Sequence, residues 1–228
     1  MHVPDGFFDA AVSAGAAVVA AGGVAVCLRK AGHELDERTA PLAGAVAAFI
    51  FAVQMINFPV GLGTSGHLMG GALAAILVGP YAGALCVTVV LIVQGLVFAD
   101  GGLTALGINV LLMAFATTVV GWLVFRLASS VLPKTRASVT LAAGLGAFVS
   151  VPAAALVFVG LFALGGNADL SIGSVAAAMT GFHVLIGIGE GLITAATIGF
   201  VATIRPDLVH GLRGVLAREQ AALAEGTA

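Results

Sequence analysis

The chain has 228 residues, of which 60% are hydrophobic and 9% are charged, and its formal net charge at pH 7 is −2. Soluble domains carry about 25% charged residues, so this composition excludes a soluble globular protein. The apolar stretches are rich in Ala, Gly and Val, small residues that allow helices to pack closely in lipid. We therefore expect an all-α integral membrane protein embedded in the lipid bilayer of the cell membrane, with no nucleic-acid partner.

Seven apolar segments predict a bundle of seven transmembrane helices, because about 20 apolar residues are needed to cross a bilayer. Phe58-Pro59 ends the second segment, and Gly79-Pro80 divides a longer apolar run into the third and the fourth. We expect residues 1–204 to form one membrane domain and the polar residues 205–228 to form a cytoplasmic C-terminal tail. In chain order, the predicted spans cover residues 8–28, 41–57, 68–78, 81–98, 103–125, 139–164 and 175–204.

The third segment has only half of the usual length, so a re-entrant segment is an alternative to a full crossing. The distribution of basic residues favours the crossing. With seven crossings all nine lie on one side of the membrane, whereas with six crossings the loop around Lys134 would change sides. The positive-inside rule then predicts an outer amino terminus and a cytoplasmic carboxyl terminus. The basic residues are Arg29, Lys30, Arg38, Arg126, Lys134, Arg136, Arg205, Arg213 and Arg218.

The first two residues predict a metal site. An amino terminus followed by His2 offers three nitrogen donors: the Met1 amine, the His2 main-chain nitrogen and the His2 imidazole. All-nitrogen, square-planar coordination suits Ni(II) or Cu(II), and one more imidazole would complete it. Our candidate for that ligand is His67, in a glycine-rich loop that the predicted topology also places on the outer face. Because the donors must lose protons, affinity is expected to rise with pH.

Several runs of residues along the chain closely resemble the CbiM/NikM family, the substrate-specific components of energy-coupling factor transporters for cobalt and nickel. The resemblance extends from the first residue through the seventh predicted span. The runs are Met1-His2-Val3-Pro4-Asp5-Gly6-Phe7, Asn57-Phe58-Pro59-Val60, Gly63-Thr64-Ser65-Gly66-His67-Leu68-Met69-Gly70-Gly71, Gly79-Pro80, Gln94 with Asp100-Gly101-Gly102, Gly107-Ile108-Asn109, and Gly181-Phe182-His183-Val184-Leu185-Ile186-Gly187 with Glu190-Gly191.

The resemblance implies a square-planar Ni(II) or Co(II) site built from Met1, His2 and His67, with the ion as transported substrate and no organic cofactor. It also implies a complex with a transmembrane coupling (T) component and two cytoplasmic ABC-type ATPases. The chain has no Gly-x-x-x-x-Gly-Lys-Ser/Thr phosphate loop, so we expect partners to hydrolyse ATP. A small accessory membrane subunit, if required, would be a separate chain.

Five further residues are candidates for supporting the ligands: Thr64, Ser65, Asn109, His183 and Glu190. Glu190 is an acid well inside a predicted span, and intramembrane ionisable groups are functional candidates by default. His183 lies on the same helix face, seven residues earlier. For each residue the alternative is structural: loop polarity for the first two, and helix polarity or packing for the others.

Two other function classes compete with a metal-capture subunit. A stand-alone secondary transporter of another small substrate would have a similar composition. An intramembrane metalloenzyme is disfavoured, because the chain has no His-Glu-x-x-His pair and the proposed ligand set leaves no open position for an activated water. We therefore expect a non-catalytic binding subunit.

Overall fold

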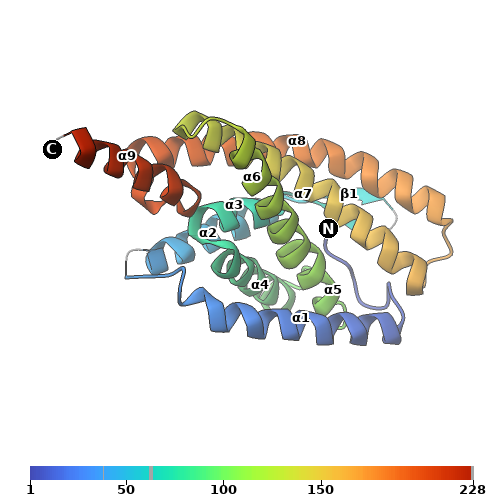
Figure 1. Ribbon diagram of the computed structural model, residues 1–228. Coiled ribbons are helices and arrows are strands. Elements are labelled where there is room, and N and C mark those ends of the chain that lie inside the picture. Colours follow the sequence, from blue (N-terminus) through green and yellow to red (C-terminus); the bar gives the residue numbers. More distant parts are fainter. Residues whose placement is uncertain (38, 62–63, 227–228) are drawn as a thin grey trace.

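The structure is a computed structural model that describes residues 1–37, 39–61 and 64–226, without the side chains of residues 58–65 and 225–226. Arg38, one of the basic residues used to predict the topology, lies outside the described residues. Within the described part, most of the chain is helical (Figure 1).

Among the described residues, five helical segments are long and apolar enough to cross a membrane, which makes the chain a multi-pass membrane protein. One of them, residues Leu106–Val131, combines α5 (Leu106–Asn109), a π-helical stretch (Val110–Ala116) and α6 (Thr117–Val131). The other four are α1 (Ala10–Ala31), α4 (Pro80–Val97), α7 (Arg136–Gly165) and α8 (Ile172–Ile204). Helices α7 and α8 pack against each other extensively.

Two shorter helices complete the bundle. Helix α2 (Thr39–Gln54) has 16 residues, whereas α3 (Gly71–Val78) has only eight, all of them buried. Eight residues rise about 12 Å, which is too little to cross a hydrocarbon core of about 30 Å. Helix α3 packs against α4, and the close approach needs Gly83, where a Cβ atom would lie 2.6 Å from the main-chain nitrogen of Ala75.

The chain passes through the protein interior between β2 and α4. His67 lies beside Met1, and the chain then runs through the non-helical residues 68–70 and α3 to Gly79. Gly79 lies against Glu34, in the connection between α1 and α2, where an added Cβ would be 2.5 Å from the carboxyl carbon. The segment predicted as the third span is a short buried helix with a non-helical lead-in.

The glycine-rich segment predicted as a loop contains a small antiparallel hairpin. Strand β1 (Phe58–Gly61) pairs with β2 (Thr64–Gly66), with Phe58 opposite Gly66 and Pro59 opposite Ser65. A two-stranded ladder satisfies main-chain hydrogen bonds that a loop would leave open. The hairpin brings the chain directly to His67.

Several helix boundaries differ from the predicted spans. Helix α6 continues to Val131 rather than to residue 125, because the helix-breaking signal is Pro133, which holds the preceding Leu132 in an extended conformation. Helix α8 begins at Ile172, where the Ser171 side chain accepts a hydrogen bond from the main-chain nitrogen of Ser174 and caps the helix. The loop between α6 and α7 is therefore only residues 132–135.

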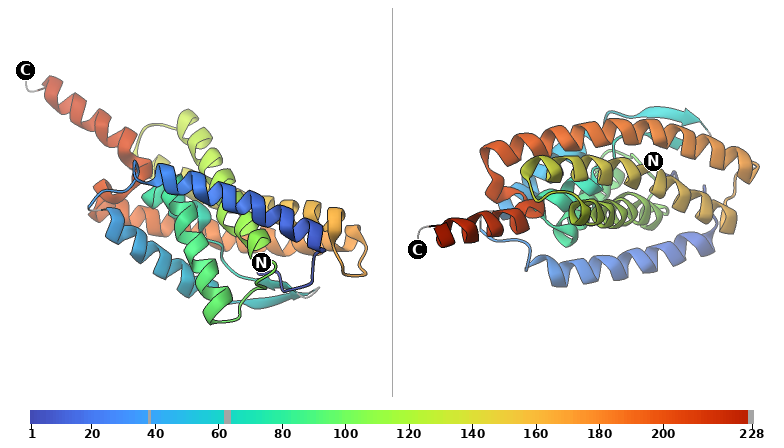
Figure 2. Two further views of the ribbon diagram at one scale, coloured as in Figure 1. Left: turned by 90° about the horizontal axis from the view of Figure 1, so that it is seen from below. Right: turned by 45° about the horizontal axis from the view of Figure 1, so that its top comes forward.

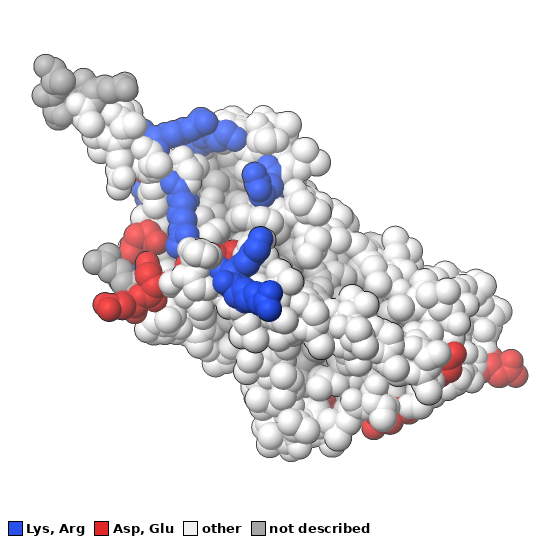
Figure 3. All heavy atoms as spheres, turned by 60° about the horizontal axis from the view of Figure 1, so that its bottom comes forward, with Lys and Arg blue, Asp and Glu red and all other residues white. Residues whose placement is uncertain are grey.

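The two termini lie in different surroundings. Residues 1–9 run back among the helices, so that the amino terminus lies inside the outline of the bundle in every ribbon view (Figures 1 and 2). The carboxyl-terminal part forms two short 3-10 turns, Pro206–Leu208 and His210–Leu212, and then α9 (Arg213–Gly226), which projects outward. Lys and Arg side chains gather toward the end that carries α9, and none is visible at the opposite end of the face in Figure 3.

Candidate metal centre

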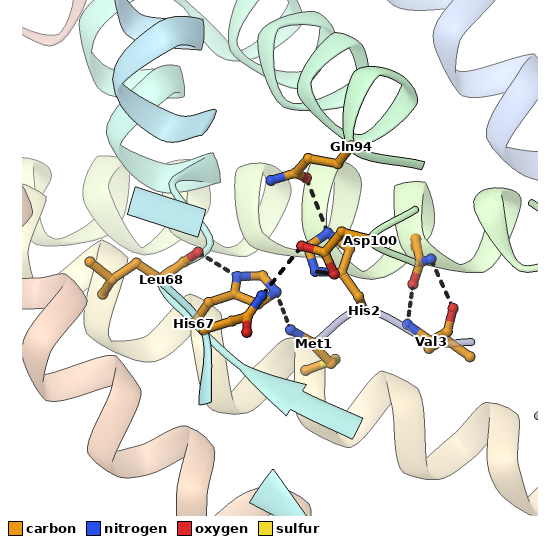
Figure 4. Close-up of polar contacts among 9 residues, drawn as sticks. Met1, His2, Val3, His67, Leu68, Gln94 and Asp100 are labelled. Atoms are coloured by element: carbon orange, nitrogen blue, oxygen red, sulfur yellow. Dashed lines mark hydrogen bonds and ion pairs between the residues drawn. The ribbon is translucent and has the colours of Figure 1, made fainter. Parts of the chain in front are cut away.

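The Met1 amine lies directly against the imidazole of His67. Its nitrogen is hydrogen-bonded to His67 Nε2, and both residues are almost completely buried. The other ring nitrogen, Nδ1, is 2.7 Å from the main-chain carbonyl oxygen of Leu68. Because a carbonyl can only accept, Nδ1 carries the hydrogen, and the Nε2 lone pair faces the amine. His67 therefore presents a nitrogen with a free lone pair to the amino terminus (Figure 4).

The His2 imidazole lies next to that of His67, with ring centroids 4.5 Å apart and planes tilted by 31°. Its Nε2 is 3.1 Å from Oε1 of Gln94, an amide oxygen that accepts the Nε2 hydrogen. The lone pair is then on Nδ1, which is buried and has no hydrogen-bond partner among the described residues. A buried nitrogen without a partner fits a metal ligand.

Asp100 provides the negative charge nearest to these nitrogens. Its Oδ1 lies 3.4 Å from His2 Nδ1 (Figure 4). Its Oδ2 accepts a hydrogen bond from the Asn57 side chain at 3.4 Å. Burial raises the pKa of Asp100, although the nearby amino terminus opposes the shift. Its ionised form would offset part of the charge of a bound cation.

Burial also prepares the nitrogen donors for binding. It lowers the pKa of the Met1 amine to about 4 and that of His2 to about 3, and it lowers the pKa of His67 well below the usual value for histidine. The physical cause is the loss of water, which disfavours the protonated, charged form of each base. Near neutral pH, all three groups are therefore neutral and carry free lone pairs.

Asn109 holds the terminal segment in place. Its Oδ1 accepts a hydrogen bond from the main-chain nitrogen of Val3 at 2.8 Å, and its Nδ2 donates to the Val3 carbonyl at 3.3 Å. The same carbonyl accepts a 2.8 Å hydrogen bond from the main-chain nitrogen of Gly102. Asn109 immediately precedes the π-helical stretch, a feature that is frequent at functional sites. The structure thus brings this predicted supporting residue to the metal centre.

Glu190 holds the segment that follows His67. Its carboxylate accepts hydrogen bonds from the main-chain nitrogens of Met69, at 2.6 Å, and Gly70, at 2.7 Å. Gln54 donates to the Met69 carbonyl at 2.7 Å. Gly70 has φ +81°, a left-handed conformation that glycine adopts without steric cost, and a Cβ there would meet Ile50. Glu190 therefore fixes the main chain of the segment that follows His67.

The other three predicted supporting residues have different outcomes. His183 is fully buried, and its Nδ1 lies 2.7 Å from the Met179 carbonyl one turn earlier in the helix. Its Nε2 has no partner among the described residues, and no direct contact with His67 is observed there. The side chains of Thr64 and Ser65 lie outside the described part, so their predicted roles stay predictions.

The described residues contain no group of three or more His, Cys, Asp or Glu side chains placed to hold a metal. The centre instead combines two imidazoles with main-chain nitrogens of the amino terminus. Two contacts that position these groups were missed by the sequence-based predictions: Gln94 to His2 and Gln54 to the His67 segment. Each is an amide buried in a helix, and that is the sequence signal that could have pointed to them.

Comparison with known proteins decides the family. Residues 2–208 match the family described as CbiM, cobalt uptake substrate-specific transmembrane region. The chain belongs to this family. The resemblance inferred from the motifs is thereby confirmed, and the protein is a membrane transport component of the CbiM/NikM type.

Individual relatives agree with this assignment. The fused nickel transport protein NikMN of Rhodobacter capsulatus is 31% identical over 234 residues, covering 96% of this chain and 67% of that protein. The cobalt transport protein CbiM of Sorangium cellulosum is 33% identical over 197 residues, covering 84% of this chain and 86% of that protein. The crystal structure of a truncated transition metal transporter superposes with a TM-score of 0.81 at 29% identity, covering 89% of this chain and 99% of that one.

Proposed function

We propose that this chain captures Ni(II) or Co(II) from outside the cell as the substrate-specific subunit of an energy-coupling factor transporter. The observation that carries the proposal is the contact between the Met1 amine and His67 Nε2, beside His2 Nδ1, which has no hydrogen-bond partner among the described residues. With the His2 main-chain nitrogen, these atoms form a set of four nitrogen donors. The ion is the cargo, and it would exchange its water shell for these nitrogens in a buried pocket.

The donor set favours late divalent transition metals. Nitrogen ligands in a square plane suit Ni(II) and Cu(II), while Mg(II) and Ca(II) prefer oxygen ligands. Binding requires ionisation of the His2 main-chain amide, which only a strongly binding metal can drive. Four protein nitrogens leave no in-plane position for an activated water, so the centre suits capture better than hydrolysis. This disfavours the metalloenzyme alternative.

We propose a topology of seven membrane segments with the metal centre on the outer side. It treats α3 and the non-helical residues 68–70 as the third crossing, because they lead from the Met1 end of the molecule to the Glu34 end. The clustering of Lys and Arg near α9 supports a cytoplasmic location for that end. Residues 1–204 then constitute the substrate-binding membrane domain, and 205–228 the cytoplasmic tail.

Release of the cargo would require the four nitrogens to separate. In the proposed complex, a transmembrane coupling component and two ABC-type ATPases distort this subunit, with a small accessory membrane subunit as an additional partner. The hydrogen bonds from Met69 and Gly70 to Glu190 tie the His67 segment to α8. A movement of α8 relative to α1 would therefore pull His67 away from the amino terminus.

Metal binding by the purified chain tests the proposal. Isothermal titration calorimetry with Ni(II) and Co(II) would be carried out on three proteins. The first has the native amino terminus, the second has one extra residue before Met1, and the third is the His67→Ala variant. We expect high-affinity binding by the first protein, with loss of the terminal site in both variants. Equal binding by all three proteins, or binding by none, would refute the terminal chelate.

Uptake measurements separate the coupled transporter from a secondary transporter. Cells or proteoliposomes containing this chain alone would be compared with ones that also contain the coupling component and ATPases, with ATP supplied or withheld. We expect sustained nickel or cobalt accumulation only in the complete, ATP-supplied system. Accumulation by the chain alone that follows an ion gradient would favour the secondary transporter.

A further inference from the structure

A second pocket lies at the basic end of the molecule, away from the metal centre. It has a volume of about 480 Å³ and lies between the end of α6, the start of α7 and the segment that leads into α9. Four of its lining residues are basic, namely Arg126, Lys134, Arg213 and Arg218, and no acidic residue is among the described residues that line it. This charge distribution fits an anionic ligand.

Much of that positive charge is free to act on a ligand. Arg126 and Arg218 are exposed and form no ion pair within the described part of the chain. Arg213 donates to the Glu34 carbonyl at 3.2 Å and also interacts electrostatically with the Glu34 carboxylate, so part of its charge is compensated. Glu219 pairs with Arg136 at the protein surface. Among the described residues, no other acidic side chain forms an ion pair near this site. The unpaired guanidinium groups can bind phosphate oxygens in a bidentate geometry.

The inner wall adds polar atoms that lack partners. The Oγ atom of Ser129 and the Nδ1 atom of His210 are buried without a hydrogen-bond partner among the described residues. Both residues line the pocket. Buried polar groups are normally satisfied, so these two groups would gain partners if their side chains turned toward a ligand with hydrogen-bonding oxygens in the pocket. The first turn of α7, where Ser138 lines the pocket, adds the positive end of a helix dipole.

The pocket is also continuous with an apolar outer surface. Val119, Leu123 and Leu127 recur every four residues along α6 and are 51%, 60% and 68% exposed. Ser130 follows on the same helix face and lines the pocket. Trp122 lines it as well, with its ring 5.3 Å from that of Phe125, and tryptophan is enriched at membrane–water interfaces. A ligand with a charged head and apolar chains matches this arrangement better than a soluble anion does.

We propose that this pocket binds the phosphate of an anionic phospholipid, whose acyl chains lie along the exposed apolar face of α6. Arg126 and Arg218 contact the phosphate oxygens, Ser129 and His210 bond the headgroup, and Trp122 lies at the boundary between head and chains. Basic pockets between transmembrane helices are a recurrent mode of anionic headgroup recognition. The proposal concerns a separate site and does not depend on the metal centre.

The chain contains a built-in probe, because Trp122 is its single tryptophan. The full-length protein would be reconstituted at constant ionic strength into phosphatidylcholine vesicles that contain either brominated phosphatidylglycerol or brominated phosphatidylcholine at the same mole fraction. Bromine quenches tryptophan fluorescence on contact, so relative quenching reports the relative affinity of the two lipids at Trp122. We expect clearly stronger quenching by phosphatidylglycerol.

The variant that tests the charges is Arg126→Gln with Arg218→Gln, and its matched control is Arg29→Gln with Lys30→Gln, which removes the same charge from the end of α1. A basic residue near an anionic membrane contributes about fivefold to lipid affinity. The ratio of phosphatidylglycerol affinity to phosphatidylcholine affinity should therefore fall about twenty-fivefold in the first variant. The control should keep most of it. Both proteins must retain Ni(II) or Co(II) binding or an unchanged thermal transition, which shows that they are folded.

Soluble anions separate the lipid from a free phosphate. Millimolar inorganic phosphate or ATP should not reverse quenching by brominated phosphatidylglycerol. If either anion reverses it, the pocket binds free phosphate groups and the lipid assignment is wrong. Equal quenching by the two brominated lipids, or an equal loss of preference in the pocket variant and the α1 control, would also overturn the proposal.

Discussion

Glu190 on α8 and Met69, 121 positions earlier in the chain, are joined by a 2.6 Å hydrogen bond from the Met69 main-chain nitrogen to the Glu190 carboxylate. The second carboxylate oxygen accepts from Gly70, the N-cap residue of α3. One side chain in the middle of α8 thus fixes two successive peptide groups directly after His67. Helix α8 is in this way connected to the segment that carries the proposed metal ligand His67.

Replacing Glu190 by Gln should weaken metal binding while the protein still folds. The glutamine oxygen can replace only one of the two carboxylate oxygens that accept hydrogen bonds from Met69 and Gly70. The NH2 group would then face the other main-chain N–H, so the His67 segment would shift. Loss of a residue that orients a ligand typically costs 10- to 100-fold in metal affinity. Calorimetric titration with Ni(II) or Co(II) would measure the change.

Glu34→Gln is the matched control for this variant. Glu34 also accepts a main-chain hydrogen bond at a helix start, from Ala82 at 2.7 Å, but it lies at the Gly79 end of the molecule. We expect it to leave metal affinity unchanged within about twofold. Unchanged affinity in Glu190→Gln would mean that Glu190 serves helix packing alone.

Asn109 clamps the amino-terminal segment through its two hydrogen bonds to the main chain of Val3, and Asn109→Ala should release that segment. The substitution removes both hydrogen bonds to Val3, each with a net contribution of about 1 kcal/mol, so metal affinity should fall by about thirtyfold. Asn167→Ala is the comparison, since Asn167 donates to the Gly6 carbonyl from an exposed position farther from the metal ligands. If both variants bind metal with the same affinity as the parent protein, the clamp does not preorganise the site.

Metal affinity should rise with pH with the slope expected for the release of one proton. The lowered pKa values of about 4 for the Met1 amine and about 3 for His2 mean that both groups are already deprotonated between pH 6 and 8. Only the His2 amide proton then remains to be released, so log affinity should rise by about one unit per pH unit. Calorimetry at pH 7 in buffers with different ionisation enthalpies would count the protons released.

A free peptide with the sequence of residues 1–5 is the control for the proton count. Its amine has an ordinary pKa of about 7.7–8.0 and must also lose its proton, so it should release about two protons or more at pH 7. Release of the same number by peptide and protein would show that burial does not prepare the donors.

Gly102→Ala should displace the amino-terminal segment by a steric clash. A Cβ atom at this position would overlap the main chain of Asp5, and backbone atoms cannot move aside as a flexible side chain can. We expect metal binding to weaken at least tenfold, the scale of an orientation defect at a metal site, with little change in helix content by circular dichroism. Gly95→Ala is the control, because its nearest contact would be an ordinary 3.7 Å to Leu103. Parent-like affinity in Gly102→Ala would contradict the observed approach of Asp5.

Sequence and tertiary structure determine different features of this protein. Composition alone determined the membrane class, since 60% hydrophobic residues in long runs cannot be accommodated in a soluble chain. Local chemistry also located the boundary between two helices at Gly79-Pro80, because proline and glycine act on the adjacent backbone whatever the fold. The terminal chelate could be proposed for the same reason, as its three donors are covalent neighbours in residues 1 and 2.

Contacts between distant segments could not be predicted in this way. The hairpin 58–66, the clamp of Asn109 on Val3 and the bond from Met69 to Glu190 each join residues that only the packed bundle brings together. Apolar periodicity does not encode which polar side chain inside a helix faces which loop. The sequence therefore determined which atoms could bind a metal. The tertiary structure decided that the Met1 amine and His67 lie in contact and are shielded from water. The physical reason is that burial and long-range hydrogen bonds arise only when the helices pack.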